Sequence, residues 1–290
     1  MSAQLTRCDA LLQRHPRAVI LATLAALGAP WVVDNYRRFL ALGQSGLTPL
    51  GPFGWLVAVT LTAFGRETVS TTEYESTEAS KERWLETSVE RRGSRPETGW
   101  HCVPHRQLDR LPSEEIAKRL DAVFEKHTDA NPTLVQITVS PHEKLHPGMI
   151  IHPDIPSPHK DAEQALREIA HVHPIDHSLH VVLSPADSKT AIDLGWAERH
   201  PLSGVTRRIL PLPNNYLLVY APRDEEELEV VERILVASIG YMTGSRSGRL
   251  RLLTETLPRN ISRFIPKLKQ SCVFINYKPV RAARSRHEFA

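Results

Sequence analysis

Hydrophobic and polar positions divide the chain into an uncharged start, a polar connection and a long alternating region. Residues 18–33 contain no charged side chain, whereas Arg17 precedes them and Asp34 follows. Their length approaches the roughly 20 residues that a membrane-spanning helix needs. Trp31 has the amphipathic ring that is common at the level of the lipid headgroups. This pattern predicts a membrane anchor within residues 1–43.

A secretory signal peptide begins in the same way, with basic residues and an apolar run. Here the bulky Trp31 and Val33 are followed by Asp34, so the segment lacks a clear small-residue cleavage site. We therefore prefer the anchor. The signal peptide and a buried helix of a soluble domain remain the alternatives.

A second uncharged stretch covers residues 39–65, but prolines and glycines interrupt its first half. Only residues 53–64 form a continuous apolar run, which is too short to span a bilayer. We expect an interfacial or re-entrant segment there, or a helix packed on the domain. Residues 66–95 are polar and charged, and they predict a solvated helix or linker. Residues 44–95 would thus connect the anchor with a domain.

Residues 96–243 have the pattern of a globular α+β domain. Apolar residues at helical spacing predict helices over 113–127, 160–170, 186–197 and 224–241. Apolar runs bounded by turn residues predict strands over 132–140, 147–153, 178–185 and 215–222. The helix over 160–170 is expected to face the core with Ala162, Ala165, Leu166 and Ile169. The connections suit a mostly antiparallel sheet with packed helices.

Composition and charge limit the kinds of partner that the protein is expected to bind. The chain is 41% hydrophobic, which supports a packed core. Its aromatic content of 6% and net charge of +3 give no support for nucleic-acid binding. The charge is uneven, because residues 244–290 hold eleven Lys or Arg against two Glu, a net of +9. This basic tail either lies on an anionic membrane surface or is a disordered, solvated segment.

The stretch "REIAHVHPIDHSLH", residues 167–180, contains four of the fourteen histidines. If His171 and His173 begin a strand, both point to the same face. A turn around Asp176, favoured by the neighbouring proline, would fold His180 back beside them. Three imidazoles would then converge on one pocket.

Such a cluster has two chemical uses. His171, His173 and His180 can bind Zn, Fe, Cu or Mn, with Asp176 as a fourth ligand or as a group that orients one of them. Alternatively, histidines that titrate near neutral pH act as general bases and as hydrogen-bond donors to an oxyanion. Histidines bonded only to backbone are the structural alternative.

A second unit, "GWAERHPLSG", covers residues 195–204. Gly195 permits a positive φ, and Pro201 restricts the backbone of His200. We expect a rigid loop that presents His200 or Trp196, or a tight connection around a packed Trp196. The chain contains no GxGxxG, GxxxxGK[ST], GxSxG or HExxH motif. Flavin, nicotinamide, nucleotide and serine-hydrolase chemistry therefore have no support.

Several long motifs resemble the fungal luciferase family. They are "REIAHVH", "SLH", "GWAERHPLSG" and "YAPRDEEELEVVERILVASIGYMTG", in that order, and the similarity covers roughly residues 95–244. The resemblance implies a membrane-associated enzyme that adds O2 to an electron-rich hydroxypyrone, 3-hydroxyhispidin. A cyclic peroxide would form and lose CO2, leaving an excited keto acid, without flavin or nucleotide. The histidine motifs of the family map onto His171, His173, His180 and His200.

On this basis we expect either His171 or His173 to be the base. His180 and His200 would hold the pyrone oxygens, and Asp176 would orient a histidine. Substrate contacts are expected from Trp196, Tyr220 and Arg223. The basic extension after "IGYMTG" and the segment "TRRILPLPNN" depart from the luminous enzymes, so we expect a hydroxypyrone or a phenolic compound as the substrate.

Three functions follow as hypotheses. The first is a membrane-anchored oxygenase that needs no cofactor besides O2 as co-substrate, with a metal ion as a possible addition. The second is a metal-dependent enzyme that uses His171, His173 and His180. The third is a non-catalytic, membrane-tethered protein that binds a small aromatic molecule. A single-pass protein of the endoplasmic reticulum or another endomembrane is expected, and nearly balanced flanking charges leave its orientation open.

Overall fold

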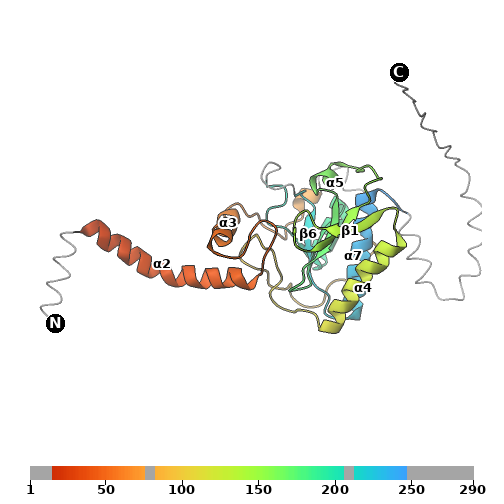
Figure 1. Ribbon diagram of the computed structural model, residues 1–290. Coiled ribbons are helices and arrows are strands. Elements are labelled where there is room, and N and C mark those ends of the chain that lie inside the picture. Colours follow the sequence, from red (N-terminus) through yellow and green to blue (C-terminus); the bar gives the residue numbers. More distant parts are fainter. Residues whose placement is uncertain (1–14, 76–81, 206–211, 247–290) are drawn as a thin grey trace, which may run out of the picture. The chain divides into compact units, whose positions relative to one another are not determined.

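A computed structural model describes residues 15–75, 82–205 and 212–246 (Figure 1). Apart from residues 244–246, the basic tail lies outside this described part. The helices are α2 (Pro16–Ala41), α3 (Pro52–Thr62), the 3-10 turn η1 (Thr72–Tyr74), α4 (Glu114–Ala130), α5 (Lys160–Gln164), α6 (Pro185–Asp193) and α7 (Glu225–Thr243). The strands are β1 (Val135–Val139), β2 (Pro147–Ile151), β3 (Glu168–Val172), β4 (Leu179–Val182), β5 (Ala197–Arg199) and β6 (Tyr216–Val219).

The strands form one antiparallel sheet in the order β1-β2-β3-β4-β6-β5. Consecutive strands from β1 to β4 are neighbours, whereas β6 inserts between β4 and β5. The expected fold class, an α+β domain with a mostly antiparallel sheet, is therefore confirmed. The turn after His173 makes β3 and β4 a hairpin, which brings His171 opposite His180.

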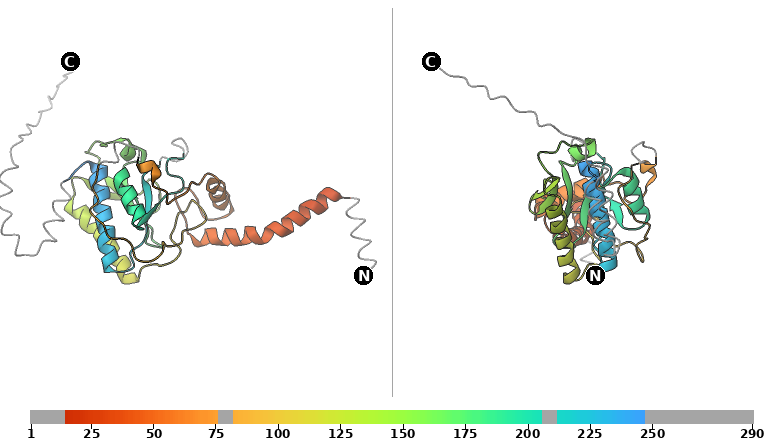
Figure 2. Two further views of the ribbon diagram at one scale, coloured as in Figure 1. Left: turned by 180° about the vertical axis from the view of Figure 1, so that it is seen from behind. Right: turned by 90° about the vertical axis from the view of Figure 1, so that its right-hand side faces the viewer.

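Helices α4 and α7 begin at polar caps that the sequence displays. The side chain of Ser113 accepts a hydrogen bond from the Ile116 amide, and that of Asp224 accepts one from the Glu227 amide. α7 contacts β3, β4 and α4, which lies beside it in Figure 2. The hydroxyl of Ser238 donates to the Val182 carbonyl oxygen at 2.8 Å, so α7 is also held to the sheet by a polar contact.

The helix predicted over residues 160–170 is too long. α5 ends at Gln164, and the next residues turn the chain into β3. Leu166 and Arg167 both have positive φ, of 54° and 67°, a conformation that closes a helix instead of continuing it. The Arg167 guanidinium donates to the carbonyl oxygens of His152 and Ile155, which holds this reversal. Leu166 is 44% exposed rather than inward-facing.

Residues 66–95 are not simply a solvated linker. Tyr74, Trp84 and Leu85 are buried in the hydrophobic core of the domain. Arg91 is buried and pairs with Glu227 of α7 at 3.1 Å. These side chains fix the polar segment to the domain, although charged residues separate them in the sequence.

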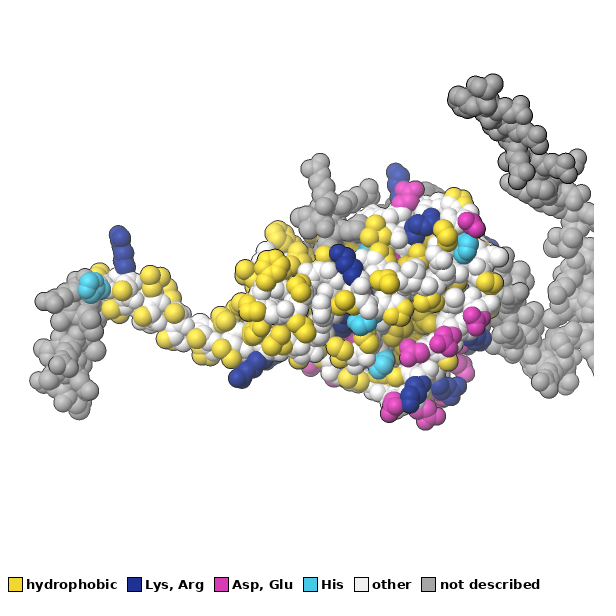
Figure 3. All heavy atoms as spheres, in the orientation of Figure 1, with side chains coloured by type: hydrophobic (Ala, Val, Ile, Leu, Met, Phe, Trp, Pro, Cys, Tyr) yellow, Lys and Arg dark blue, Asp and Glu magenta, His cyan; other side chains and the backbone are white. Residues whose placement is uncertain are grey.

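α2 is long and apolar enough to cross a membrane by length and composition, and a signal sequence near an N-terminus meets the same criteria. Hydrophobic side chains are numerous on the surface of α2 and α3 in Figure 3. Leu27 of α2 and Phe53 of α3 are both exposed. The C-terminal half of α2 is attached to the domain. The Asn35 side-chain oxygen accepts a hydrogen bond from the Trp55 indole at 2.8 Å, and it lies 3.0 Å from His101 Nε2.

Candidate functional site

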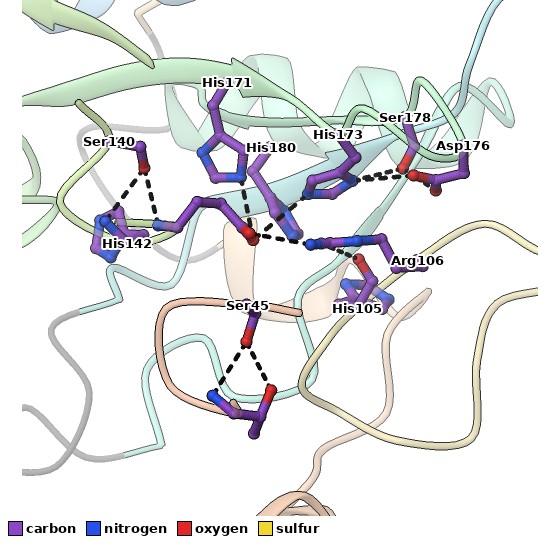
Figure 4. Close-up of polar contacts among 12 residues, drawn as sticks. Ser45, His105, Arg106, Ser140, His142, His171, His173, Asp176, Ser178 and His180 are labelled. Carbon is purple, nitrogen blue, oxygen red and sulfur yellow. Dashed lines mark hydrogen bonds and ion pairs between the residues drawn. The ribbon is translucent and has the colours of Figure 1, made fainter. Parts of the chain in front are cut away.

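The predicted histidines meet on one face of the sheet. Strand pairing sets His171 opposite His180, and His180 opposite Leu218 of β6. Ring centroids of His171 and His173 lie 5.1 Å apart, and those of His173 and His180 lie 4.8 Å apart (Figure 4). His200 joins the cluster from the segment after β5, with its ring 5.2 Å from that of His180. The structure thus brings together all four histidines of the family motifs.

A cavity of about 210 Å³ opens beside this cluster. Its polar wall contains His105, His180 and His200 together with Tyr216. The rest of the lining comes from the α2–α3 connection and from the segments before α4, before β2, after α5 and before β6, namely Ser45, Leu47, Val103, Pro104, Pro141, His142, Glu143, Lys144, Leu166 and Leu212. His171 and His173 lie deeper and are not part of this lining.

Hydrogen bonds fix the ring proton of three histidines. His171 Nδ1 contacts the carboxylate of Glu168, and His180 Nδ1 lies 3.1 Å from the Leu217 carbonyl oxygen. Both acceptors lack a proton to donate, so Nδ1 carries the hydrogen in each ring. His173 Nδ1 lies 2.8 Å from the Ser178 hydroxyl, which itself donates to Asp176. His173 therefore also has its proton on Nδ1, and all three Nε2 atoms carry lone pairs.

A buried ion pair lies against these Nε2 atoms. Glu143 Oε2 accepts from Arg106 at 3.0 Å, and both side chains are almost inaccessible to solvent. The other oxygen, Glu143 Oε1, lies 3.7 Å from His171 Nε2 and 4.0 Å from His173 Nε2. These separations are too long for hydrogen bonds. Neither Nε2 atom has a hydrogen-bond partner among the described residues.

A second group of hydrogen-bonded side chains consists of His105, Glu198 and Tyr220, and its His105 lines the cavity. His105 Nε2 lies 2.8 Å from Glu198 Oε1, and the Tyr220 hydroxyl donates to Glu198 Oε2 at 2.9 Å. His105 Nδ1 is consequently the free lone pair of that ring. In His200, Nδ1 accepts a hydrogen bond from the Leu202 amide at 3.0 Å. The proton of a neutral His200 thus sits on Nε2, where it is available for donation.

Burial sets the charge of the site. It lowers the pKa of His173, His180 and His200 well below the usual value, and the positive charge of Arg106 adds to this effect. These imidazoles are therefore neutral near pH 7. Burial also raises the pKa of Tyr216 well above its usual value, so its phenol stays protonated. The wall accordingly offers neutral proton acceptors and donors to a ligand.

The carboxylates of the site respond to burial in different ways. Burial raises the pKa of Asp176, although hydrogen bonds from Ser178 and the Gln107 amide oppose the rise. Burial alone would raise the pKa of Glu198 too, but the hydrogen bonds from His105 and Tyr220 help to bring it below the usual value. Glu198 is therefore an anion that can stabilise a positive charge on His105.

The remaining predicted residues occupy other places. Trp196 is buried outside the cavity lining, and its indole donates to the Val89 carbonyl oxygen at 2.7 Å. Tyr220 reaches the site only through Glu198. Arg223 lies at the start of α7, where its guanidinium pairs with Glu227. None of these three side chains lines the described cavity.

Four polar groups of the site escaped the sequence reasoning: His105, Glu143, Glu198 and Arg106. The segment "HCVPHRQ", residues 101–107, carried a visible signal, because it is a second histidine-rich stretch. Glu198 lies inside the stretch "GWAERHPLSG" and Glu143 follows His142, but nothing in either stretch marks the carboxylate as a partner of the histidine cluster. Only the folded sheet brings them to the histidines.

The chain resembles known luciferases over most of its length. Residues 166–238 match the family model described as Luciferase domain. The luciferase of Armillaria mellea is 34% identical over 246 residues, which cover 80% of this chain and 88% of that protein. The luciferase of Neonothopanus nambi is 32% identical, with the same two coverages. No solved structure matches the chain. With this identity across nearly the whole length of these relatives, the chain belongs to the fungal luciferase family.

Proposed function

We propose that this protein is a luciferase-type oxygenase, which adds O2 to an electron-rich hydroxypyrone or phenolic compound and releases CO2. The family membership supports the use of O2. The observation that carries the proposal is the cavity with His105, His180 and His200 in its wall. A flat hydroxylated ring matches such a wall, because its oxygens need donors and acceptors while its faces contact apolar side chains.

In the proposed reaction, His105 removes the proton of the substrate enol. Its Nδ1 lone pair is free, and Glu198 holds Nε2–H at 2.8 Å. A carboxylate in this position orients the imidazole and stabilises the imidazolium that forms. His200 has its proton on Nε2 and donates it to the resulting enolate oxygen. This assignment moves the base from His171 or His173 to His105, because His105 lines the cavity and those two do not.

The electrons for the reaction come from the substrate. The enolate carbon forms a bond to O2, and the new peroxide closes onto the pyrone carbonyl carbon. The O–O bond and both ring bonds of that carbonyl carbon, to the peroxide-bearing carbon and to the ring oxygen, then break, so that this carbon leaves as CO2 and the ring oxygen stays in the keto acid. One oxygen atom of O2 ends in CO2 and the other in the keto acid, so the balance needs no flavin, nicotinamide or other reductant. The enzyme supplies a base, an oxyanion donor and a site that excludes water.

Membrane attachment is part of the proposal. We place the protein in an endomembrane, such as the endoplasmic reticulum, as a single-pass protein with α2 as the span. The support is the length and composition of α2 and the exposed apolar side chains of α2 and α3. Ser45 and Leu47, from the connection between these helices, line the cavity. The substrate would therefore reach its site close to the membrane surface.

The test is to mix the purified full chain with 3-hydroxyhispidin in air and to record O2 uptake and photons together. Stoichiometric uptake is expected, and His105→Gln should reduce its rate about 10²- to 10⁴-fold, the range for loss of a general base. His177→Asn is the matched control. This residue has a φ of 56°, which Asn accepts, and it lies outside the cavity lining. Absence of O2 uptake across hydroxypyrones and phenolics would contradict the proposal and favour a non-catalytic binding protein.

A further inference from the structure

Two buried histidine nitrogens next to the cavity, His171 Nε2 and His173 Nε2, carry lone pairs that accept no hydrogen bond from the described residues. Both side chains are at most 1% exposed. Nearly all buried polar atoms in proteins are satisfied, so two neighbouring exceptions need an explanation. One positively charged ion between them would satisfy both atoms.

We infer that His171, His173, His180 and Glu143 form a binding site for one divalent transition-metal ion. One ligand atom from each of the three histidines lies within 4.8 Å of the others. Three imidazoles and one carboxylate are a ligand set for Zn²⁺, Fe²⁺, Mn²⁺ or Cu²⁺. The inference concerns binding and does not depend on the proposed reaction.

The distances fit a metal centre better than hydrogen bonds. Glu143 Oε1 lies 3.7 Å from His171 Nε2 and 4.0 Å from His173 Nε2. Two ligand atoms at about 2.1 Å from a tetrahedral ion are about 3.4 Å apart. The Glu143 oxygen therefore needs to approach each of these two nitrogens by only a few tenths of an ångström, within reach of side-chain rotation.

Each histidine is already oriented as a metal ligand. Metal-binding histidines donate their second ring N–H to a carboxylate, a carbonyl oxygen or a water. Here the Nδ1 protons go to Glu168 from His171, to the Leu217 carbonyl oxygen from His180, and to Ser178 from His173. All three Nε2 lone pairs are consequently free for one ion.

Charge also favours a cation at this place. Glu143 and Glu168 can carry two negative charges beside the cluster, against the single positive charge of Arg106. The remaining negative charge favours a bound cation. Glu143 and His180 also belong to the cavity lining, so the ion would lie at the cavity wall, next to a bound substrate.

A rival set, His105, His180 and His200, is close enough in space but has the wrong proton positions. Its ligand atoms also lie within 4.8 Å of one another. However, His200 Nδ1 accepts from the Leu202 amide, which leaves a proton on Nε2. This set offers only two free lone pairs, and both oxygens of the neighbouring Glu198 already accept hydrogen bonds.

Metal binding can be measured on the full chain in detergent. The protein is first treated with a chelator, then titrated with Zn²⁺ and, separately, with Co²⁺, whose visible absorption reports the geometry of its ligands. We expect one equivalent of either metal per chain. His171→Gln and Glu143→Gln should each weaken the affinity at least about tenfold, and Glu168→Gln, which retains all four ligands, about 10- to 100-fold. Far-UV circular dichroism checks that each variant is folded.

His105→Gln is the matched control, because it removes a histidine of the rival set only. It should bind metal with the affinity of the unchanged chain. The inference is overturned if the folded chain binds less than one equivalent, or if His105→Gln loses the metal while His171→Gln retains it. O2 uptake is recorded in the same samples. Metal binding without uptake would contradict the proposed reaction alone, and uptake without metal binding would contradict this site alone.

Discussion

Replacing Glu198 by glutamine tests whether His105 works as a base supported by a carboxylate. The amide side chain would keep the size of the original and an oxygen for His105 Nε2–H, but it would remove the negative charge. In the unchanged chain, His105 Nε2 and Glu198 Oε1 form a buried hydrogen bond of 2.8 Å. The Tyr220 hydroxyl donates to the other oxygen of Glu198 and so helps to hold the carboxylate in place. The substitution thus removes the negative charge at residue 198 while the hydrogen bond that positions the His105 ring is kept.

The expected magnitude follows from the type of bond. Hydrogen bonds to a charged group contribute about 1.5–3 kcal/mol, and each 1.36 kcal/mol changes a rate tenfold, so kcat/KM should fall about 10- to 150-fold. Tyr220→Phe removes a supporting bond of about 1 kcal/mol and should lower kcat/KM about fivefold. KM should change little in either variant, because Glu198 and Tyr220 are not part of the cavity lining.

The assay is the initial rate of O2 uptake with 3-hydroxyhispidin, together with nitrogen NMR of the His105 ring. In the unchanged chain, the spectrum should show an unprotonated Nδ1. Glu198→Gln should retain this tautomer while the rate falls. If the rate of Glu198→Gln equals that of the unchanged chain while His105→Gln is inactive, the carboxylate has no part in the proton transfer and the reasoning is refuted.

Three further predictions concern stability and membrane attachment. The hydrogen bond from His127 lowers the pKa of Glu232 to about 2, so this carboxylate stabilises the fold above its ordinary pKa of 4.5 and loses the effect as the pH falls toward 2. Glu232→Gln should lower the free energy of unfolding by about 1–2 kcal/mol at pH 7, since water screens part of the attraction, and by less near pH 2. A Cβ at Gly240 would lie 2.5 Å from the buried Trp84 ring, so Gly240→Ala should lower stability by about 1–3 kcal/mol in thermal melting. Replacing Leu21, Leu24 and Leu27 in the middle of α2 by aspartate should release the protein from alkali-washed membranes. Each aspartate makes membrane insertion of the helix less favourable by about 2.5–3.5 kcal/mol.

Each of these three predictions has a control variant or a result that would contradict it. Equal destabilisation by Glu232→Gln at pH 2 and pH 7 would contradict the ionic contribution. Gly28→Ala is the control for overpacking, because a Cβ there meets no atom within 4 Å. Val139→Asp, on the exposed surface of the sheet, is the control for the membrane variants. Retention of the α2 aspartate variant in the membrane pellet would refute the span.

The elements that the sequence predicted well are those whose signals are local. Ser113 and Asp224 cap α4 and α7 three residues before the amides that they bind. The turn around Asp176 places His171 opposite His180, as the alternation of the strand requires. In each case the responsible residues stand within about ten positions of one another, and the physics of the segment determines its structure.

The features that the sequence did not predict depend on contacts between distant segments. β5 forms because Glu198 pairs with Leu218 of β6, a partner that its own short segment does not specify. The same pairing brings Glu198 to His105, which is 93 residues away in the sequence. α5 stops early because Arg167 binds carbonyl oxygens of residues 152 and 155. Local periodicity contains no information on such partners.

The attachment of α2 to the domain limits how this protein can be engineered. Asn35 contacts both Trp55 and His101, and the connection after α2 provides Ser45 and Leu47 to the cavity wall. The N-terminal segment is therefore not an interchangeable module. A version shortened to the 166–238 match, or to residues 96–243, would lack part of the cavity wall. A water-soluble version of this chain would have to retain Asn35 and the α2–α3 connection and exchange the exposed apolar residues of α2 individually.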